Sequence, residues 1–288
     1  MSKFYDCLVI TSGAVKGFSI LGALDYLEST NSLKWINIFG GCSVGAAISY
    51  LIMIGYTPKE ILTYTSQNDL LQLFSAINLL TLPEHFGVID SNLLLHYLEE
   101  MTMLKLGYIP TFSDVSKMSN KFFMCPSYNL SSTESSVYFS VLTHPDMPIV
   151  KAVSLSCNIP LLFSRAKWNN DYYIDGAYFD VFPIKKLIQL TNPKSVIGIT
   201  FDHEDSKDMK IESLVDYLKS IISIKNHDNR RGKFIQDYKE FLETRKDVKC
   251  DIVKLKCEVN GLDFSLSVKE RLDMYLKGKE YMKKYFIN

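Results

Sequence analysis

Short apolar runs and small-residue loops alternate in the N-terminal part of the chain. The run Cys7–Ile10 is apolar throughout, which is typical of a strand in a parallel sheet that is covered on both faces. Apolar residues then recur at helical spacing from Phe18 to Leu27, and Ile36–Phe39 indicates a second strand before another apolar helix. Two successive strand–helix units predict a parallel sheet with right-handed crossover connections.

The rest of the chain contains further strand and helix patterns and no internal repeat. The segment 57–117 is mostly helical, with prolines as punctuation. An apolar patch from Leu70 to Leu82 is either a core-packed helix, which we favour, or a lipid-facing lid. Asp171–Phe182 has the pattern of a β-hairpin that turns at Asp175-Gly176. Further strands are expected at 121–128, 137–142, 196–201 and 250–257, and further helices at 150–155, 213–225 and 268–285.

Length and composition fit one globular domain. The chain has 288 residues, of which 47% are hydrophobic and 22% charged. We expect a single domain over 1–288, with a core at 5–202 and a C-terminal elaboration at 203–288. The Lys and Arg residues (32) balance the Asp and Glu residues (32), so no net charge attracts the protein to nucleic acid. A nucleic-acid partner is therefore not expected.

Cysteine usage and the N-terminus bear on location. The six cysteines form neither a C-x-x-C pair nor a zinc-like spacing, which favours a reducing compartment. The N-terminus lacks a signal-peptide pattern, and no run reaches the roughly 20 apolar residues that a membrane-spanning helix needs. We expect a cytoplasmic protein whose contact with membranes is peripheral.

The pentapeptide Gly41–Gly45 has the pattern G-x-S-x-G, with Ser43 at its centre, and lies between a predicted strand and a predicted helix. In that context the motif forms a sharp turn that exposes the serine side chain. The following helix directs its N-terminal N–H groups toward that serine. The alternative is a glycine-rich turn in which Ser43 is only a helix N-cap.

The loop Ser12–Gly17 follows the preceding strand. Parallel strands place such loops side by side at their carboxyl ends, so the backbone N–H groups of Gly13 and Ala14 can face Ser43 as an oxyanion hole. The alternatives are a phosphate-binding loop or a plain turn. The loop has too few glycines for a dinucleotide fingerprint and lacks the GK[ST] ending of a P-loop.

The three elements, taken in order, resemble the patatin-like phospholipase family: a small-residue oxyanion loop with a basic residue, an early G-x-S-x-G, and a distal Asp-Gly-Ala at Asp175–Ala177. The resemblance spans nearly the whole chain. The segments that carry it further are Gly87–Ser91 (G-x-x-D), Thr111–Val115 (T-F-x-D-L), Ala152–Phe163 (A-x-x-A-S-x-x-I-P-x-x-F), Asp175–Pro183 (D-G-x-x-x-x-N-x-P) and the closing helix Ser267–Gly278.

The resemblance implies a three-layer patatin-like α/β fold with a mostly parallel central sheet flanked by helices. It implies that Ser43 attacks an acyl ester of a glycerolipid, that Asp175 accepts its proton, and that no catalytic histidine, metal or cofactor takes part. The partner is then a phospholipid or another acyl-ester lipid. The implied oxyanion donors are Gly13, Ala14 and Val15, and the supporting motif residues are Lys16, Gly17, Gly41, Gly45, Gly176 and Ala177.

The chain departs from the family pattern at two places. The family's loop begins with three glycines, whereas Ser12 and Ala14 occupy the first and third places here. If the third place needs a positive φ angle, Ala14 is strained. Val181 replaces the family's asparagine in N-x-P, although Pro183 is kept. Neither change touches Ser43 or Asp175.

Several alternatives stay open. An α/β-hydrolase would complete a Ser–Asp–His triad with His203 or His227, whereas we expect all five histidines to be structural or solvent-facing. A protein with this fold can also be an inactive lipid- or partner-binding protein, or can transfer the acyl group to an alcohol or lysolipid. Cys42 is expected to be a packed small side chain rather than a nucleophile.

Overall fold

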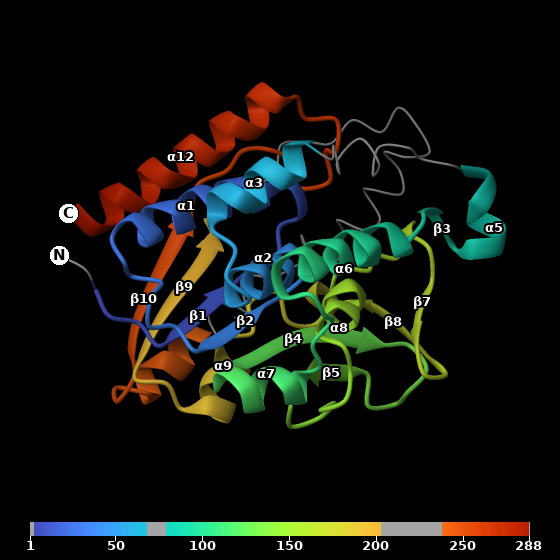
Figure 1. Ribbon diagram of the computed structural model, residues 1–288, viewed down its shortest axis with the longest axis horizontal. Coiled ribbons are helices and arrows are strands. Elements are labelled where there is room, and N and C mark those ends of the chain that lie inside the picture. The colour runs from blue at the N-terminus through green and yellow to red at the C-terminus, as the bar shows by residue number, and fades with distance from the viewer. Residues whose placement is uncertain (1–2, 68–78, 203–237, 288) are drawn as a thin grey trace.

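The computed structural model describes residues 3–67, 79–202 and 238–287. At its centre, these residues form an eight-stranded sheet in the order β10-β9-β1-β2-β4-β8-β7, with β5 paired to β4 (Figure 1). The pairs β10–β9, β9–β1, β1–β2 and β2–β4 are parallel, and the pairs on the other side of β4 are antiparallel. The strands are β1 (Cys7–Ile10), β2 (Ile38–Gly41), β4 (Phe122–Asn129), β5 (Ser136–Phe139), β7 (Ala166–Trp168), β8 (Asp171–Asp175), β9 (Ser195–Phe201) and β10 (Lys249–Leu255).

Helices cover both faces of the sheet, as the three-layer prediction requires. Leu8 and Ile10 of β1 belong to the larger core, together with α1, α2, α8 and α12, whereas Cys7 and Val9 belong to a second core against α9. The helices are α1 (Gly17–Ser29), α2 (Val44–Met53), α3 (Pro58–Gln67), α5 (Leu82–His85), α6 (Asn92–Leu106), α7 (Phe112–Ser119), α8 (Ile149–Ser156), α9 (Ile184–Thr191) and α12 (Val268–Ile287), with 3₁₀ turns η1 (Ala14–Lys16), η2 (Leu79–Thr81) and η3 (Gly176–Tyr178).

Most of the predicted elements are present. The strand Cys7–Ile10 has the predicted bounds, and the second strand begins at Ile38 and not at Ile36. A small parallel sheet of β3 (Gly87–Ile89) and β6 (Leu161–Phe163) was not predicted. The helix expected at 213–225 lies outside the described residues, and so does most of the apolar patch at 70–82, within which Leu80 is exposed.

The predicted hairpin at Asp171–Phe182 is wrong. β8 ends at Asp175, and the chain continues into η3 instead of turning back. The strand antiparallel to β8 is β7, which precedes it, and the two are joined at Asn169-Asn170. The Asp175 side chain accepts a hydrogen bond from the N–H of Ala177 and so caps the 3₁₀ turn, a local bond that competes with the hairpin.

The C-terminal segment belongs to the same layers. β10 extends the parallel side of the sheet beside β9, and α12 lies along α1 (Figure 1). Lys279 of α12 forms an ion pair with the buried Asp25 of α1 at 2.6 Å. No helix within residues 3–67, 79–202 and 238–287 is long and apolar enough to cross a membrane.

Candidate active site

Ser43 stands at a sharp turn between β2 and α2. Its backbone has φ 54° and ψ −128°, in the positive-φ region that side-chain-bearing residues seldom occupy. A Cβ atom on Gly45 would lie 2.4 Å from the carbonyl oxygen of Thr11, so only glycine allows α2 to begin this close to the end of β1. Gly41 is the last residue of β2. The structure therefore has the strained strand–turn–helix geometry that the pentapeptide predicts.

The side chains of Ser43 and Asp175 meet in the interior. Ser43 Oγ donates a hydrogen bond to Asp175 Oδ2 at 2.6 Å. Both residues are buried, with relative exposures of 5% and 3%. The Asp175 carboxylate also accepts from the N–H of Ala177 at 2.8 Å, and the Asp175 N–H donates to the carbonyl of Asn158 at 2.8 Å. Asp175 is thus held at both its backbone and its carboxylate, with one oxygen left to face the serine.

Burial changes the acidity of this carboxyl group. Desolvation raises the pKa of Asp175 from 3.8 to about 6, against the opposing effect of the hydrogen bonds from Ser43, Ala177 and Cys42. A carboxylate with a pKa near 6 is still ionised at neutral pH and is a better proton acceptor than an ordinary aspartate. The site therefore presents a hydroxyl group and a base in direct contact.

Two neighbouring side chains complete the surroundings of Ser43. The Cys42 thiol lies 3.9 Å from Asp175 Oδ1, and its pKa is raised well above the usual range by burial, so it packs as the small side chain that was expected. The Ser156 hydroxyl accepts a hydrogen bond from the backbone N–H of Ser43 at 3.2 Å. Sequence reasoning assigned no role to Ser156, although it lies within the Ala152–Phe163 motif.

The small-residue loop approaches the same site. Ala14 has φ 45°, so the third place of the loop does require a positive φ angle and its alanine is strained. Ala14 and Val15 line the cavity that contains Ser43. The N–H of Val15 already donates to the carbonyl of Gly261 at 3.1 Å. Among the described residues, the N–H groups of Gly13 and Ala14 have no hydrogen-bond acceptor, so they are the free donors of this loop.

The rest of the predicted loop and motif residues serve as supports. The Lys16 ammonium lies 5.3 Å from the ring centroid of Phe201, a cation–π contact beneath the loop. Gly17 begins α1 where a Cβ atom would lie 2.8 Å from a Val44 methyl group. Gly176 follows Asp175 where a Cβ atom would lie 2.3 Å from the carbonyl of Pro126.

The backbone carbonyl of Val181 joins the small-residue loop to the segment that carries Asp175. Its carbonyl accepts hydrogen bonds from the N–H of Ser12 at 2.9 Å and from Thr11 Oγ1 at 3.0 Å. The neighbouring Asp180 carboxylate accepts from the Tyr138 hydroxyl at 2.8 Å and from the N–H of Phe182 at 3.2 Å. The segment that carries Asp175 therefore also holds the small-residue loop. Because the bond uses the main chain, a side chain other than asparagine is accommodated at 181.

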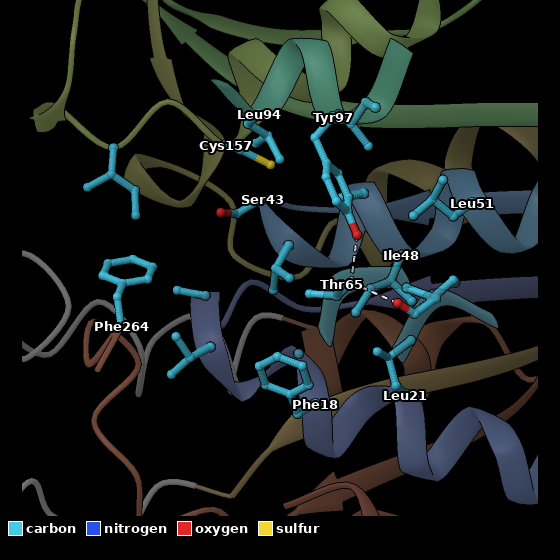
Figure 2. Close-up of a pocket in the computed structure, with 18 of the residues that line it drawn as sticks. Phe18, Leu21, Ser43, Ile48, Leu51, Thr65, Leu94, Tyr97, Cys157 and Phe264 are labelled. Carbon is cyan, nitrogen blue, oxygen red and sulfur yellow. Dashed lines mark hydrogen bonds between the residues drawn. The ribbon is translucent and has the colours of Figure 1, made fainter. Parts of the chain in front are cut away.

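Ser43 opens into an apolar cavity (Figure 2). The space between its walls is about 850 Å³, part of which is open solvent at its mouth. Its walls come from α1, α2, α3 and α6, with Cys157 and Phe264 beside the serine end. Of the described side chains that line it, those with an oxygen atom are Ser43, Thr65 and Tyr97.

The described histidines lie away from this cavity. His85 and His96 are exposed beside glutamates, and His144 packs against Phe139 with ring centroids 4.8 Å apart. His203 and His227, the residues considered for a triad, lie outside the described residues. Within the described ranges, no three His, Cys, Asp or Glu side chains are grouped as a metal site.

Comparisons with known proteins identify relatives of this chain. The chain is 32% identical over 196 residues to the probable lipid hydrolase 463L of Invertebrate iridescent virus 6. The aligned region covers 67% of this chain and 67% of that one. It is 26% identical over 295 residues to the uncharacterized protein R571 of Acanthamoeba polyphaga mimivirus, covering 97% of this chain and 93% of that one.

Solved structures share the fold at low sequence identity. VipD from Legionella pneumophila matches with a TM-score of 0.51 and 14% identity, over 98% of this chain and 67% of that one. ExoU, from its complex with SpcU of Pseudomonas aeruginosa, matches with a TM-score of 0.55 and 15% identity, over 98% of this chain and 51% of that one. The family model described as Patatin-like phospholipase matches residues 8–188, more than half of the chain, so this protein belongs to the patatin-like phospholipase family.

Proposed function

We propose that this protein is a serine lipid acyl hydrolase of the phospholipase A or lysophospholipase type, which cleaves acyl esters of glycerolipids. The observation that carries the proposal is the buried 2.6 Å hydrogen bond from Ser43 Oγ to Asp175 Oδ2 at the end of an apolar cavity. Family membership and the similarity to a probable lipid hydrolase support the same class of substrate.

The chemistry proposed for the pair is acyl transfer through an acyl-enzyme. Ser43 Oγ attacks the ester carbonyl carbon while its proton passes to Asp175 Oδ2. The N–H groups of Gly13 and Ala14 donate to the oxyanion that forms. When the intermediate collapses, the alcohol leaves with the proton from Asp175. Water then attacks the acyl-enzyme while Asp175 takes one of its protons, and the fatty acid is released as that proton passes from Asp175 to Ser43 Oγ.

The direct contact between Ser43 and Asp175 favours this dyad over a Ser–Asp–His triad. In a triad the imidazole lies between the serine and the carboxylate and hydrogen-bonds to both. Here the carboxylate oxygen already occupies the position beside Ser43 Oγ. Replacing His203 and His227 with alanine tests the difference, since a triad loses its turnover with one of them and a dyad with neither.

The shape of the cavity supports a lipid substrate. An apolar cavity that begins at the nucleophile can hold the acyl chain of the ester and exclude water from the acyl-enzyme. Lipids with such chains are held in membranes or micelles. We therefore propose that the protein works in the cytoplasm in peripheral contact with a lipid surface.

The test is release of fatty acid from a phosphatidylcholine with two different acyl chains, in the presence of a chelator and with mass spectrometry as the readout. Wild-type protein is expected to release fatty acid, and Ser43→Ala is expected to be at least about 10³-fold slower. Ser49→Ala is the matched control, since this buried serine of α2 donates to the Gly40 carbonyl and does not contact Asp175.

Each outcome of this test bears on a different claim. Equal release by wild type and Ser43→Ala rejects Ser43 as the nucleophile. No release by folded wild type with any acyl ester favours the inactive lipid-binding alternative. Transfer of the acyl group to an added lysolipid or alcohol, in place of free fatty acid, identifies an acyltransferase that uses the same residues.

A further inference from the structure

The cavity beside Ser43 follows the axis of α2. Val44, Ala47, Ile48 and Leu51 line it, and their spacing places them along one side of the helix. Ser43 immediately precedes this helix. At a rise of 1.5 Å per residue, Leu51 lies about 12 Å along the helix axis from the nucleophile. The helix thus sets the distance between the reacting atom and the far end of the cavity.

The far end of the cavity is closed by apolar side chains. Leu51 of α2, Leu21 of α1 and Ile61 of α3 all line the cavity. Their relative exposures are 2%, 3% and 4%, so all three side chains are buried. In Figure 2 Ser43 lies between Phe264 on one side and Leu21 and Leu51 on the other. An acyl chain that enters from Ser43 therefore meets a wall.

A polar pair joins α3 and α6 in the wall of the cavity. Thr65 Oγ1 donates to the carbonyl of Ile61 at 2.7 Å, so the 2.7 Å contact between Thr65 Oγ1 and the Tyr97 hydroxyl uses the proton of Tyr97. Each hydroxyl proton thereby has an acceptor within the wall (Figure 2). The pair can lie against hydrocarbon without leaving a donor unpaired.

We infer that this cavity measures the acyl chain and accepts in full a chain of medium length, of about ten carbons. A fully extended chain of single bonds advances roughly 1.2 Å per bond, as the polypeptide backbone does, so about ten bonds span the 12 Å from Ser43 to Leu51. The inference rests on the proposed function and adds to it a substrate class. A longer chain has to leave its tail outside the cavity.

The test compares saturated acyl esters of about six, ten and sixteen carbons, which extend roughly 7, 12 and 19 Å. They are presented as monomers in water, each below its critical micelle concentration, as esters of one water-soluble alcohol. Each methylene that enters the apolar cavity is expected to raise kcat/KM about fourfold. The rise should stop near ten carbons. A rise that continues unbroken to sixteen, or one that ends at six, overturns the inference.

Two variants are expected to shift the break, which is the acyl-chain length at which the rise in kcat/KM stops, in opposite directions. Ala47 lies about 6 Å along α2 from Ser43, so Ala47→Leu obstructs the cavity there and should move the break to about five carbons. Leu51→Ala opens the far end and should move it beyond ten. Leu27→Ala is the matched control, because Leu27 is an equally buried leucine that does not line the cavity. Its break should stay at that of the wild type.

A binding experiment separates this inference from the proposed function. In the Ser43→Ala protein, free fatty acids of the same three lengths compete with a fluorescent fatty acid for the cavity. Affinity should rise with length up to about ten carbons and then level off, whether or not the wild type hydrolyses any ester. Affinity that is independent of length rejects the measuring cavity. Absent turnover together with a break in affinity rejects the proposed function alone.

Discussion

The Asp175 carboxyl group has a pKa of about 6 in the folded protein, against 3.8 for an ordinary aspartate, because it is buried. The shift suits a base that takes a proton from serine near neutral pH. It also means that the folded state binds this proton more tightly than the unfolded state does. The contribution of Asp175 to stability is therefore largest below about pH 4 and is lost as the pH rises through 6.

Asp175→Asn is therefore expected to abolish turnover and to stabilise the protein at neutral pH. Removing a buried carboxylate whose pKa is raised by about two units raises the free energy of unfolding by up to about 3 kcal/mol above pH 7. The gain should shrink as the pH falls and vanish below about pH 4. Denaturant titrations of both proteins at several pH values measure it.

A matched control is Asp180→Asn. Burial also raises the pKa of Asp180 to about 6, but its carboxylate contacts Tyr138 and Phe182 and not Ser43. This variant should show a similar pH dependence of stability and retain measurable turnover. If Asp175→Asn destabilises the protein at pH 8, burial does not raise the pKa of the Asp175 carboxyl group.

At the scale of elements, three loops from distant parts of the chain form the site. The turn after β2 provides Ser43, the end of β8 provides Asp175, and the loop after β1 provides the free N–H groups. The carbonyl of Val181 fastens the loop after β1 to the segment after β8. This fastening uses the main chain of Val181 and not its side chain, and it holds the loop that carries Gly13 and Ala14 to the segment that follows Asp175.

Thr11→Val tests the fastening, since it removes one of the two hydrogen bonds to the Val181 carbonyl and keeps the shape of the buried side chain. The expected loss of stability is about 1 kcal/mol. If the loop N–H groups act on the oxyanion, kcat should fall by up to about fivefold with KM nearly unchanged, because the interaction is made in the transition state. A higher KM at an unchanged kcat would assign the loop to substrate binding instead.

The motifs singled out Ser43 and Asp175, whose side chains lie in contact, whereas local patterns alone misplaced one element of the fold. Asp175-Gly176 between aromatic residues has a strong hairpin pattern, yet the Asp175 side chain bonds to the N–H of Ala177 and directs the chain into η3. The contribution of Ser156 was missed because a hydroxyl that accepts from a backbone N–H produces no pattern along the chain. Contacts of the main chain, such as the Val181 carbonyl, are equally invisible to residue identity.

At the scale of the whole molecule, the site extends beyond the residues that match the family. The match ends at 188, but β9 and β10 complete the parallel side of the sheet next to β1. The carbonyl of Gly261 accepts a hydrogen bond from the N–H of Val15, and Phe264 lines the cavity. The C-terminal segment therefore shapes the cavity as well as the sheet. The sequence did not predict this contribution, because Gly261 and Phe264 lie between β10 and α12, where the chain has no periodic pattern of apolar residues.

The position of this segment depends on how closely α12 lies against α1. A Cβ atom on Gly22 would lie 1.8 Å from the carbonyl oxygen of Tyr275, and one on Gly278 would lie 2.0 Å from that of Ser19. Both clashes are with backbone, which no side-chain rotation relieves. Gly22→Val must therefore push α12 away from α1, at a cost of about 3 kcal/mol or more in the free energy of unfolding.

The same displacement should reach the active site, because α12 follows the segment that contains Gly261 and Phe264. Gly22→Val is expected to lower kcat/KM for long acyl esters more than for acetate esters, since Phe264 lines the cavity that is proposed to hold the acyl chain. Ser29→Val, at the exposed end of the same helix, is the control and should change both quantities little. Chemical denaturation and the ratio of the two kcat/KM values measure the effect. A Gly22→Val protein with wild-type stability would show that the two helices are not in backbone contact, and an unchanged ratio would separate the C-terminal segment from the cavity.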